Sequence, residues 1–445
     1  MTIPLKMIKI KMSRAGAPVA IAGMALCLSL VGMPPALSQT AALGNDMMTF
    51  AEPQSSITLD AAIRLALESN PGIAAARREI EAAQAHVMQS ALRPNPDFLY
   101  SAEDSGNAYR TSSAEIDLPI ETAGKREARI DAAVRGGSVA VSDLRGRQIK
   151  VRSSVMVAFF EVLAAQEQAT LTRDALRLAQ RATDVAVKRV TAGKVSPVEE
   201  TKARVAEAGV RVALLQAESD LRSARSRLSS LWGNPAPRFT EVVGEIDRLP
   251  ELPKHDVVQQ RLNASPLVER ARLELERRQS LVVVEQSKTV PDFSVTVGVK
   301  RREDSHRDQL LVGVKVPLPV FNRNQGNLLE ALRREDKARD ELLATQVSLS
   351  SEVLQALERI SARRDEAELL RRDIVPGARS AYEAATIGFE NGKFSFLEVL
   401  DAQRTYFTAK TQYLGILSAL HRAVTDLEGL LGQAEAGNAM PSTKE

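Results

Sequence analysis

Side chains that could perform chemistry are few and widely separated in this sequence. The four histidines are His86, His255, His306 and His421, and no two of them have the spacing of a metal-ligand pair. The only cysteine, Cys27, lies in an apolar N-terminal run, so no cysteine-based metal site or disulfide is expected in the mature chain. Serine, aspartate and glutamate form no motif with a nucleophile and a base in recognisable order. The sequence therefore favours a protein that is not an enzyme and needs no cofactor.

The N-terminus has the pattern of a secretory signal. Four basic residues precede an apolar run over 17–33, and the small residues Ala36 and Ser38 fit a signal-peptidase site. The run is shorter than the about 20 residues of a spanning helix. A lipid anchor on Cys27 would need a small residue before it, where a leucine stands. Residues 1–38 hold four of the 59 Lys and Arg and none of the 56 Asp and Glu, so their removal leaves 55 basic residues and weakens any case for nucleic acid.

The chain contains an internal duplication. Three segments recur in the same order, at offsets of 195, 198 and 199: 70–98 with 265–293, 116–133 with 314–331, and 192–200 with 391–399. Such ordered self-similarity predicts two copies of one structural unit. The predicted organisation is a signal peptide (1–38), an extended segment (39–57), a first repeat (58–232), a linker (233–254), a second repeat (255–432) and a flexible tail (433–445).

Each copy carries the same series of expected elements. Asn70 and Ser265 are good N-caps followed by proline, which predicts helices to about Leu92 and Lys288. Strand pairs follow, and then helical hairpins, of which the first has a helix over 123–191 and a return helix over 197–231. At 1.5 Å per residue, a helix over 123–191 is about 100 Å long. The expected seam of this long helix consists of Leu171, Ala175, Leu178, Ala182 and Val185.

The four predicted strands alternate apolar and polar residues over about ten positions, at 96–104, 112–120, 291–301 and 308–318. The expected lipid-facing residues are Phe98, Tyr100, Ile116, Leu118, Phe293, Val295, Val297, Val299, Val312, Val314 and Val316. This alternation is typical of transmembrane barrels, although an amphipathic sheet packed on the helices of a soluble protein is the alternative. Open strand edges are excluded from lipid, and about eight strands make the smallest barrel. The strands therefore predict a barrel shared among several chains.

The stretches "ITLDAAIRLALESNPGIAAAR" and "GKFSFLEVLDAQRTY", with the duplicated plan, resemble the TolC-like outer membrane efflux proteins over nearly all of the mature chain. "ETAGKREARIDAA" and "VPLPVFNRNQGNLLEA" resemble the cobalt-zinc-cadmium heavy-metal branch in particular. The resemblance implies an α+β membrane protein whose long helical hairpins form a periplasmic α-barrel. It also implies a homotrimer with a 12-stranded barrel, a periplasmic adaptor (membrane fusion) protein and an inner membrane RND-type pump. The expected location is the outer membrane of a Gram-negative bacterium.

The turns of the two helical hairpins are the expected periplasmic tip. Gly193 and Gly392 permit a left-handed cap, and Ser196 and Ser395 can cap the return helices. Plain helix turns would have the same residues. By resemblance, the adaptor contacts Arg189, Gly193, Val195, Ser196, Gly392 and Ser395.

Two further features, acidic residues near the tip and a proline inside the second long helix, concern gating. Under threefold symmetry, five acidic residues would form rings that favour cations, or each could be a solvated surface charge: Glu199, Glu383, Glu390, Glu398 and Asp401. Pro376 and Gly377 are expected to kink the second hairpin, because proline removes a helical hydrogen bond. The kink suggests that the second hairpin is the movable one.

The function that these features predict is an outer membrane channel of a tripartite RND-type system, exporting heavy-metal cations. Two alternatives stay open from the sequence alone. One is a TolC-like exit duct for drugs or secreted protein. The other is a periplasmic coiled-coil scaffold without a pore, which would give the strands no reason for one wholly apolar face.

Overall fold

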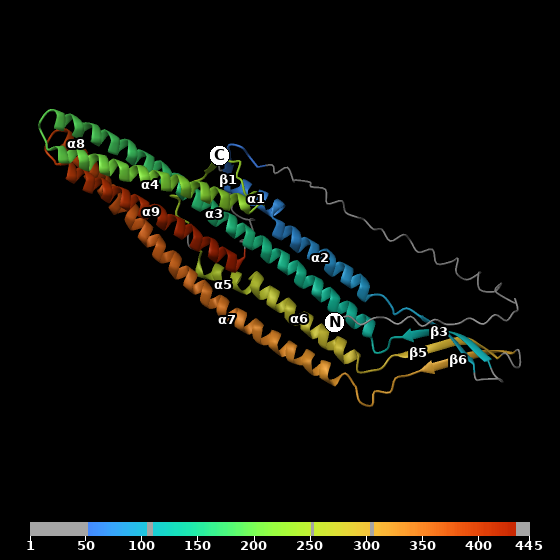
Figure 1. Cartoon of the computed structure of the whole chain (residues 1–445). Helices are drawn as coiled ribbons and strands as arrows, with labels where there is room; N and C mark the ends of the chain where they lie inside the picture. Colours follow the sequence, from blue (N-terminus) through green and yellow to red (C-terminus); the bar gives the residue numbers. More distant parts are fainter. Residues whose placement is uncertain (1–51, 105–109, 251–252, 303–306, 433–445) are drawn as a thin grey trace, which may run out of the picture. The chain divides into compact units, whose positions relative to one another are not determined.

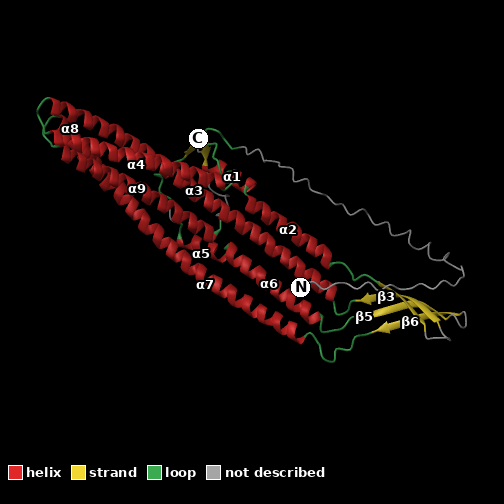
Figure 2. Ribbon diagram, in the orientation of Figure 1, coloured by secondary structure: helices red, strands yellow, loops and turns green. Residues whose placement is uncertain are grey.

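The structure is a computed structural model, which describes residues 52–104, 110–250, 253–302 and 307–432. The predicted signal peptide, most of the extended segment and the predicted C-terminal tail lie outside the described residues. Among the residues described, no helix combines the length and apolarity needed to cross a membrane. Figure 1 shows long helices that lead into one small sheet, and Figure 2 separates the two kinds of element by colour.

The first half of the chain follows the predicted order of elements, with one short strand and one short helix added at its start. Its elements are β1 (Ser56–Thr58), α1 (Leu59–Ser69), α2 (Pro71–Ser90), β2 (Asp97–Asp104), β3 (Arg110–Ile120), α3 (Lys125–Thr191) and α4 (Pro197–Ser230). The predicted cap of α2 is confirmed, because the Asn70 side chain accepts a hydrogen bond from the Gly72 amide at 2.8 Å. The 67 residues of α3 confirm the long first helix.

The second half repeats this order with one interruption. Its elements are β4 (Glu241–Val243), α5 (His255–Asn263), α6 (Pro266–Ser287), β5 (Phe293–Arg302), β6 (Arg307–Lys315), α7 (Gln325–Leu369), a π-helical turn η2 (Leu370–Ile374), α8 (Val375–Glu390) and α9 (Phe396–Leu431). Ser265 caps α6 as predicted, by accepting from the Leu267 amide at 3.3 Å.

Helix α3 packs against helices from both halves of the chain. Near its start it packs on α2 and α6, and toward its end it packs on α4 and α9. The predicted seam of α3 is shifted by one position except at Ala175, which is buried as expected. Thr172, Ala179, Thr183 and Ala186 are buried in place of Leu171, Leu178, Ala182 and Val185. Small side chains on this face allow two helices to approach α3 together, so the larger residues beside the seam are only half-buried.

A core that no sequence pattern predicted lies where the two halves of the chain meet. Trp232 and Phe159 are buried there with residues of α1, α4 and α9. Strands β1 and β4 pair in parallel, with Ile57 opposite Val242. The Gln166 side chain donates to the Val242 carbonyl at 3.0 Å and accepts from its amide at 2.8 Å, so an α3 side chain extends this small sheet.

The predicted strands are confirmed and form one antiparallel sheet in the order β2-β3-β5-β6. The register aligns the predicted apolar residues across all four strands: Phe98 lies opposite Ile116, Ile116 opposite Val297, and Val297 opposite Val312. The ladder between β3 and β5 joins the two halves of the chain. Strand β6 ends at Lys315, three residues earlier than predicted, at an edge that has no partner strand among the described residues.

Candidate functional site

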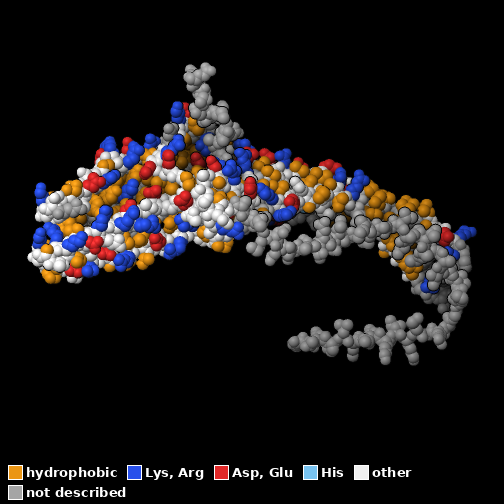
Figure 3. All heavy atoms as spheres, turned by 90° about the horizontal axis from the view of Figure 1, so that it is seen from above, with side chains coloured by type: hydrophobic (Ala, Val, Ile, Leu, Met, Phe, Trp, Pro, Cys, Tyr) orange, Lys and Arg blue, Asp and Glu red, His pale blue; other side chains and the backbone are white. Residues whose placement is uncertain are grey.

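The first candidate site is the apolar face of the four-stranded sheet. Phe98 and Tyr100 on β2, Ile116 on β3, Val297 on β5 and Val312 on β6 are all exposed, Val312 to 66%. Figure 3 shows hydrophobic side chains gathered where the four-stranded sheet lies, whereas charges of both signs are interspersed over the helices. Several large apolar residues in contiguous exposure require a covering that a monomer in water does not provide.

The opposite face of the sheet is polar and is held by side-chain hydrogen bonds. Thr296 donates to Asp117 at 2.7 Å across β5 and β3, and Ser101 lies 2.9 Å from Ser113 across β2 and β3. Leu99 and Leu311 are apolar exceptions on this face. The two faces therefore differ in the way that the alternation predicts.

The second candidate site is the pair of hairpin turns, whose geometry is as the sequence predicted. Gly193 and Gly392 have φ values of +70° and +75°, in the left-handed region that favours glycine. Ser196 accepts from the Val198 amide at 3.3 Å, and Ser395 accepts from the Glu398 amide at 3.4 Å. Both return helices therefore begin at serine caps.

An apolar cluster packs the two turns together. It contains Ala186 on α3, Ala203 on α4, Tyr382 and Phe389 on α8, and Phe396 on α9. The Phe389 and Phe396 rings lie 5.8 Å apart. The two hairpins are thus fixed to each other at their ends.

Arg189 connects the first turn to the second. Its guanidinium lies 4.9 Å from the centre of the Phe389 ring, a cation–π contact, and a Cβ on Gly392 would lie 3.2 Å from its Nη2 atom. The structure therefore brings Arg189 and Gly392 together, while Gly193 and Ser196 are exposed on the other turn and Val195 is half-buried.

The five predicted gate acids have different surroundings. Glu383 pairs with Arg379 at 2.8 Å, and Glu398 accepts from the Ser395 amide, so both are engaged in their own segment. Glu199 and Asp401 have no ion-pair partner among the described residues. The side chain of Glu390 lies outside the described residues. Glu199 and Asp401 are therefore the described members of this set whose carboxylates are not paired with another charge.

Glu398 closes a reciprocal capping box with Ser395, which gives a pH-dependent prediction. Hydrogen bonds from Ser395 hold the pKa of Glu398 below its usual value. A lowered folded-state pKa means that the stabilisation is present above the unfolded pKa, near 4.3, and is lost as the pH falls through the folded pKa. We expect amide exchange in the first turn of α9 to accelerate as the pH falls below about 4.3, after correction for intrinsic rates, and Glu398→Gln to remove most of that dependence.

A matched control for this prediction is Glu383→Gln, since Glu383 forms only an exposed i,i+4 pair. If wild type and Glu398→Gln show the same pH dependence in this turn, the capping box does not carry it.

The π-helical turn η2 ends at Ile374, two residues before Pro376. Proline cannot donate the backbone hydrogen bond of a regular helix, and π-turns are one way to accommodate such a loss. The first hairpin has no counterpart, because α3 is continuous over 67 residues. The position of the predicted interruption near Pro376 and Gly377 therefore coincides with a change in helical hydrogen bonding.

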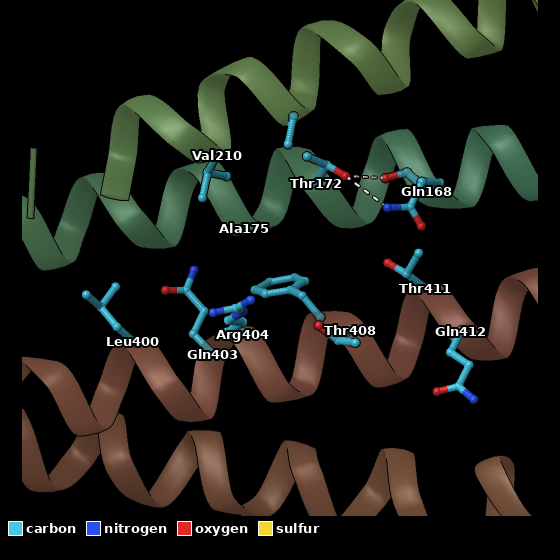
Figure 4. A pocket seen from close by; sticks show the side chains of 12 residues that line it. Gln168, Thr172, Ala175, Val210, Leu400, Gln403, Arg404, Thr408, Thr411 and Gln412 are labelled. Atoms are coloured by element: carbon cyan, nitrogen blue, oxygen red, sulfur yellow. Dashed lines mark hydrogen bonds between the residues drawn. The ribbon is translucent and has the colours of Figure 1, made fainter. Parts of the chain in front are cut away.

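A cavity of about 640 Å³ lies among α3, α4 and α9, as Figure 4 shows. Its walls combine apolar residues such as Val210, Leu400 and Phe407 with Gln168 and Gln403. Gln403 is 6% exposed, and its Nε2 atom has no hydrogen-bond partner among the described residues. Sequence reasoning missed this cavity, because its wall residues have no motif in common and are joined only by helix packing.

One histidine has a structural role. His421 stacks on Phe160 at a centroid distance of 3.8 Å, and its Nε2 atom lies 3.0 Å from the Ile246 carbonyl, to which the N–H donates. Burial lowers the pKa of His421. Among the described residues, no group of three or more His, Cys, Asp or Glu side chains could hold a metal ion.

Sequence reasoning also missed a group of hydrogen bonds that joins the two halves of the chain near the four-stranded sheet. Asp292 accepts from Lys125 Nζ at 2.7 Å and from the Thr122 amide at 2.8 Å, and the Thr122 hydroxyl donates to the Pro291 carbonyl at 2.9 Å. The "PDF" that recurs where β2 and β5 begin was the available signal.

Known proteins match both the sequence and this geometry. The family model described as "Outer membrane efflux protein" matches residues 62–234 and again 257–433. The cobalt-zinc-cadmium resistance protein CzcC of Cupriavidus metallidurans is 45% identical over 85% of this chain and 90% of its own length. The nickel-cobalt-cadmium resistance protein NccC of Alcaligenes xylosoxydans xylosoxydans is 26% identical over 64% of this chain and 65% of its own length. The crystal structure of the Campylobacter jejuni CmeC outer membrane channel has a TM-score of 0.70 at 18% identity, covering 84% of this chain and 85% of that one.

Proposed function

Because the chain belongs to the outer membrane efflux protein family, we propose that three copies form a channel that exports heavy-metal cations. The chain is an outer membrane protein of a Gram-negative bacterium, with its helices extending into the periplasm. The observation that carries the channel proposal is the sheet: four strands with one exposed apolar face and two unpaired edges. Three such sheets would give a closed barrel of twelve strands.

The two edges of the sheet are different, which favours a ring over a two-fold dimer. Strand β2 is one edge and β6 is the other, so an edge-to-edge contact between copies runs head to tail. The helices support the same arrangement. Exposed apolar residues lie on α4, at Val198, Val205 and Val212, and on α7, at Val347 and Leu354. These stripes lie on opposite sides of the core around Trp232, because Ala203 of α4 packs at the turns whereas Leu349 of α7 packs with residues of α5, α6 and α9, so each would be covered by a different element of a neighbouring copy.

The cation cargo is inferred from relatives. Both CzcC and NccC are named for resistance to metals such as cobalt and cadmium, and the match to this chain covers 90% of the length of CzcC. A water-filled passage needs no resident metal site, because ions can pass with their hydration shells. Substrate choice would lie mainly with an RND-type pump in the inner membrane.

The tip is the proposed docking surface for a periplasmic adaptor. Arg189 and Gly392 form one contact unit, and the exposed Gly193 and Ser196 form a second on the neighbouring turn, with Val195 beside them. Ser395 begins α9 next to the first unit. Two similar turns in one chain would offer six docking positions around a trimer.

Acidic residues near the tip are proposed to narrow the closed channel and favour cations. We expect Glu390→Ala combined with Asp401→Ala to raise single-channel conductance and to lower cation selectivity, because two rings of three charges would be lost. Planar-bilayer recordings measure both quantities. Glu383→Ala is the control, since that carboxylate is already paired with Arg379. Unchanged conductance and selectivity in the double variant would contradict the assignment.

The second hairpin is proposed as the movable one, because it alone contains η2 and Pro376. We expect Pro376→Ala to restore a regular helix, and thereby to alter the frequency of channel opening while trimers still assemble. Gly209→Ala is a suitable control, because this glycine lies in α4 of the first hairpin and no atom lies within 4 Å of the added Cβ. Wild-type opening in bilayers and wild-type pump-dependent resistance in Pro376→Ala would count against the proposal.

The export function can be tested in cells that produce a metal-type RND pump and its adaptor but lack an outer membrane channel. Supplying this chain should restore growth on cobalt, zinc or cadmium, and the purified protein should conduct ions in planar bilayers. Conductance without metal resistance would retain the channel and reject the metal cargo. Material that is monomeric and does not conduct would reject the channel itself.

A further inference from the structure

The two hairpins of the sheet have the same internal register. In the first, Leu99 lies opposite Glu115. Its counterpart in the second hairpin, at the offset of 195, is Ser294, which lies opposite Lys315. Lys315 is therefore the structural counterpart of Glu115, at an offset of 200.

This equivalence corrects the offset of 198 that the sequence suggested for this segment. Sequence alignment matched Pro119 with Pro317, whereas the offset of 200, continued past Lys315, matches it with Pro319. The starts of the two following helices support the offset of 200. Gly124 before α3 and Asn324 before α7 are 200 residues apart, and both have a positive φ, of 67° and 59°. The offsets of 198 and 200 differ by two residues, so both place the apolar residues of the two hairpins on the same face. Alternation alone could therefore not distinguish them.

The junction between the two halves of one chain shows how one hairpin binds the next. Strand β3 of the first pairs with β5 of the second, with Glu115 opposite Gly298 and Leu118 opposite Val295. We propose that β6 pairs with β2 of a neighbouring copy in this same register. Lys315 then lies opposite Glu103, Val316 opposite Ala102 and Leu318 opposite Tyr100 of that copy. This inference rests on the proposed trimer and specifies its contact.

The side chains of the two edges are complementary in this register. Val316 and Leu318 are exposed, Leu318 to 81%, and they would join Tyr100 and Ala102 on the apolar face. Pro319 would lie opposite Leu99 of the neighbouring copy, just as Pro119 lies opposite Ser294 in the ladder between β3 and β5. Pairing would also extend β6 beyond Lys315, where it now ends for lack of a partner.

The charges match on the polar face. Lys315 and Glu103 are exposed, and neither has an ion-pair partner among the described residues. At the equivalent position within the chain, a Cβ on Gly298 would lie 2.6 Å from Cγ of Glu115, so a glycine accommodates the carboxylate there. Between copies, Lys315 would instead lie opposite Glu103, and opposite charges directly across a strand pair attract each other.

Cysteine cross-linking tests the register directly. The only native cysteine, Cys27, lies in the predicted signal peptide, so introduced thiols would be alone in the mature chain. Combining Lys315→Cys with Glu103→Cys should give covalent dimers and trimers on oxidation. The control combines Lys315→Cys with Leu99→Cys, which lies four residues away on the same face, about 13 Å along the strand. We expect the first pair to cross-link on the order of tenfold faster, since directly opposite Cβ atoms lie about 5 Å apart.

A charge exchange gives a second readout that needs no thiols. Lys315→Glu alone should lower the fraction of trimer in detergent, and Lys315→Glu with Glu103→Lys should restore it. Trimers that cross-link faster at Leu99, or a double variant no better than the single one, would overturn the register and leave the channel standing. Absence of any trimer in the wild-type protein would reject both the register and the proposed function.

Discussion

Replacing Val312 with arginine is expected to prevent the protein from assembling in the outer membrane. Val312 is 66% exposed in the middle of β6, on the apolar face opposite Val297. An arginine on the lipid face near the bilayer centre costs about 2–4 kcal/mol. Because each of three copies would carry the change, the assembled channel should be lost. Fractionation of outer membranes and trimer content in detergent measure the effect.

The adjacent residue provides the matched control. Leu311 lies on the same strand but on the polar face of the sheet, opposite Gly298. Leu311→Arg adds the same side chain toward the side that a channel would fill with water, and it should retain assembly. If both variants insert equally well, the apolar face does not contact lipid.

Replacing Trp232 with alanine is expected to cause the largest loss of folding stability. Trp232 is fully buried, and its ring lies 6.0 Å from that of Phe239. Removing a buried aromatic side chain costs about 3–5 kcal/mol through lost burial and the cavity that remains. Thermal unfolding in detergent should show a markedly lower midpoint. Reduced yield of folded protein from membranes would accompany it.

Two substitutions define the physical cause of this loss. Leu231→Ala changes the preceding residue, which is only half-buried, and should cost much less. Trp232→Phe should also be milder than alanine, because the indole Nε1 atom has no hydrogen-bond partner to lose among the described residues. An alanine variant as stable as Leu231→Ala would show that this core does not hold the two halves together.

The elements that the sequence predicted are those with strong local signals. Alternation over ten residues determined all four strands of the sheet, and capping residues such as Asn70 and Ser265 determined where helices begin. The three-residue strands β1 and β4 could not be predicted, because they are too short for a pattern. Their pairing joins segments that are distant in the sequence, and Gln166, which bonds to the Val242 backbone, becomes a neighbour only when α3 packs against them.

The predictions about packing were less complete for a related reason. The seam of α3 was predicted correctly at Ala175 but one residue away elsewhere, because the helix must contact α4 and α9 at once, which selects the small Ala179 over Leu178. At the tip, the turn geometry followed from Gly193 and Gly392, whereas the engagement of Glu383 and Glu398 required coordinates. Which of the acids would face the proposed channel depends on neighbouring copies and stays a prediction.

The difference between the two edges of the sheet has a consequence for mixed populations of subunits. A chain with a damaged β6 would still offer an intact β2, so it could join a normal copy and leave the growing assembly without a closing contact. In a cell with one normal and one altered allele, random mixing would then spoil most complexes, and the alteration would behave as genetically dominant. Damage that unfolds the chain before it meets other copies would instead be recessive.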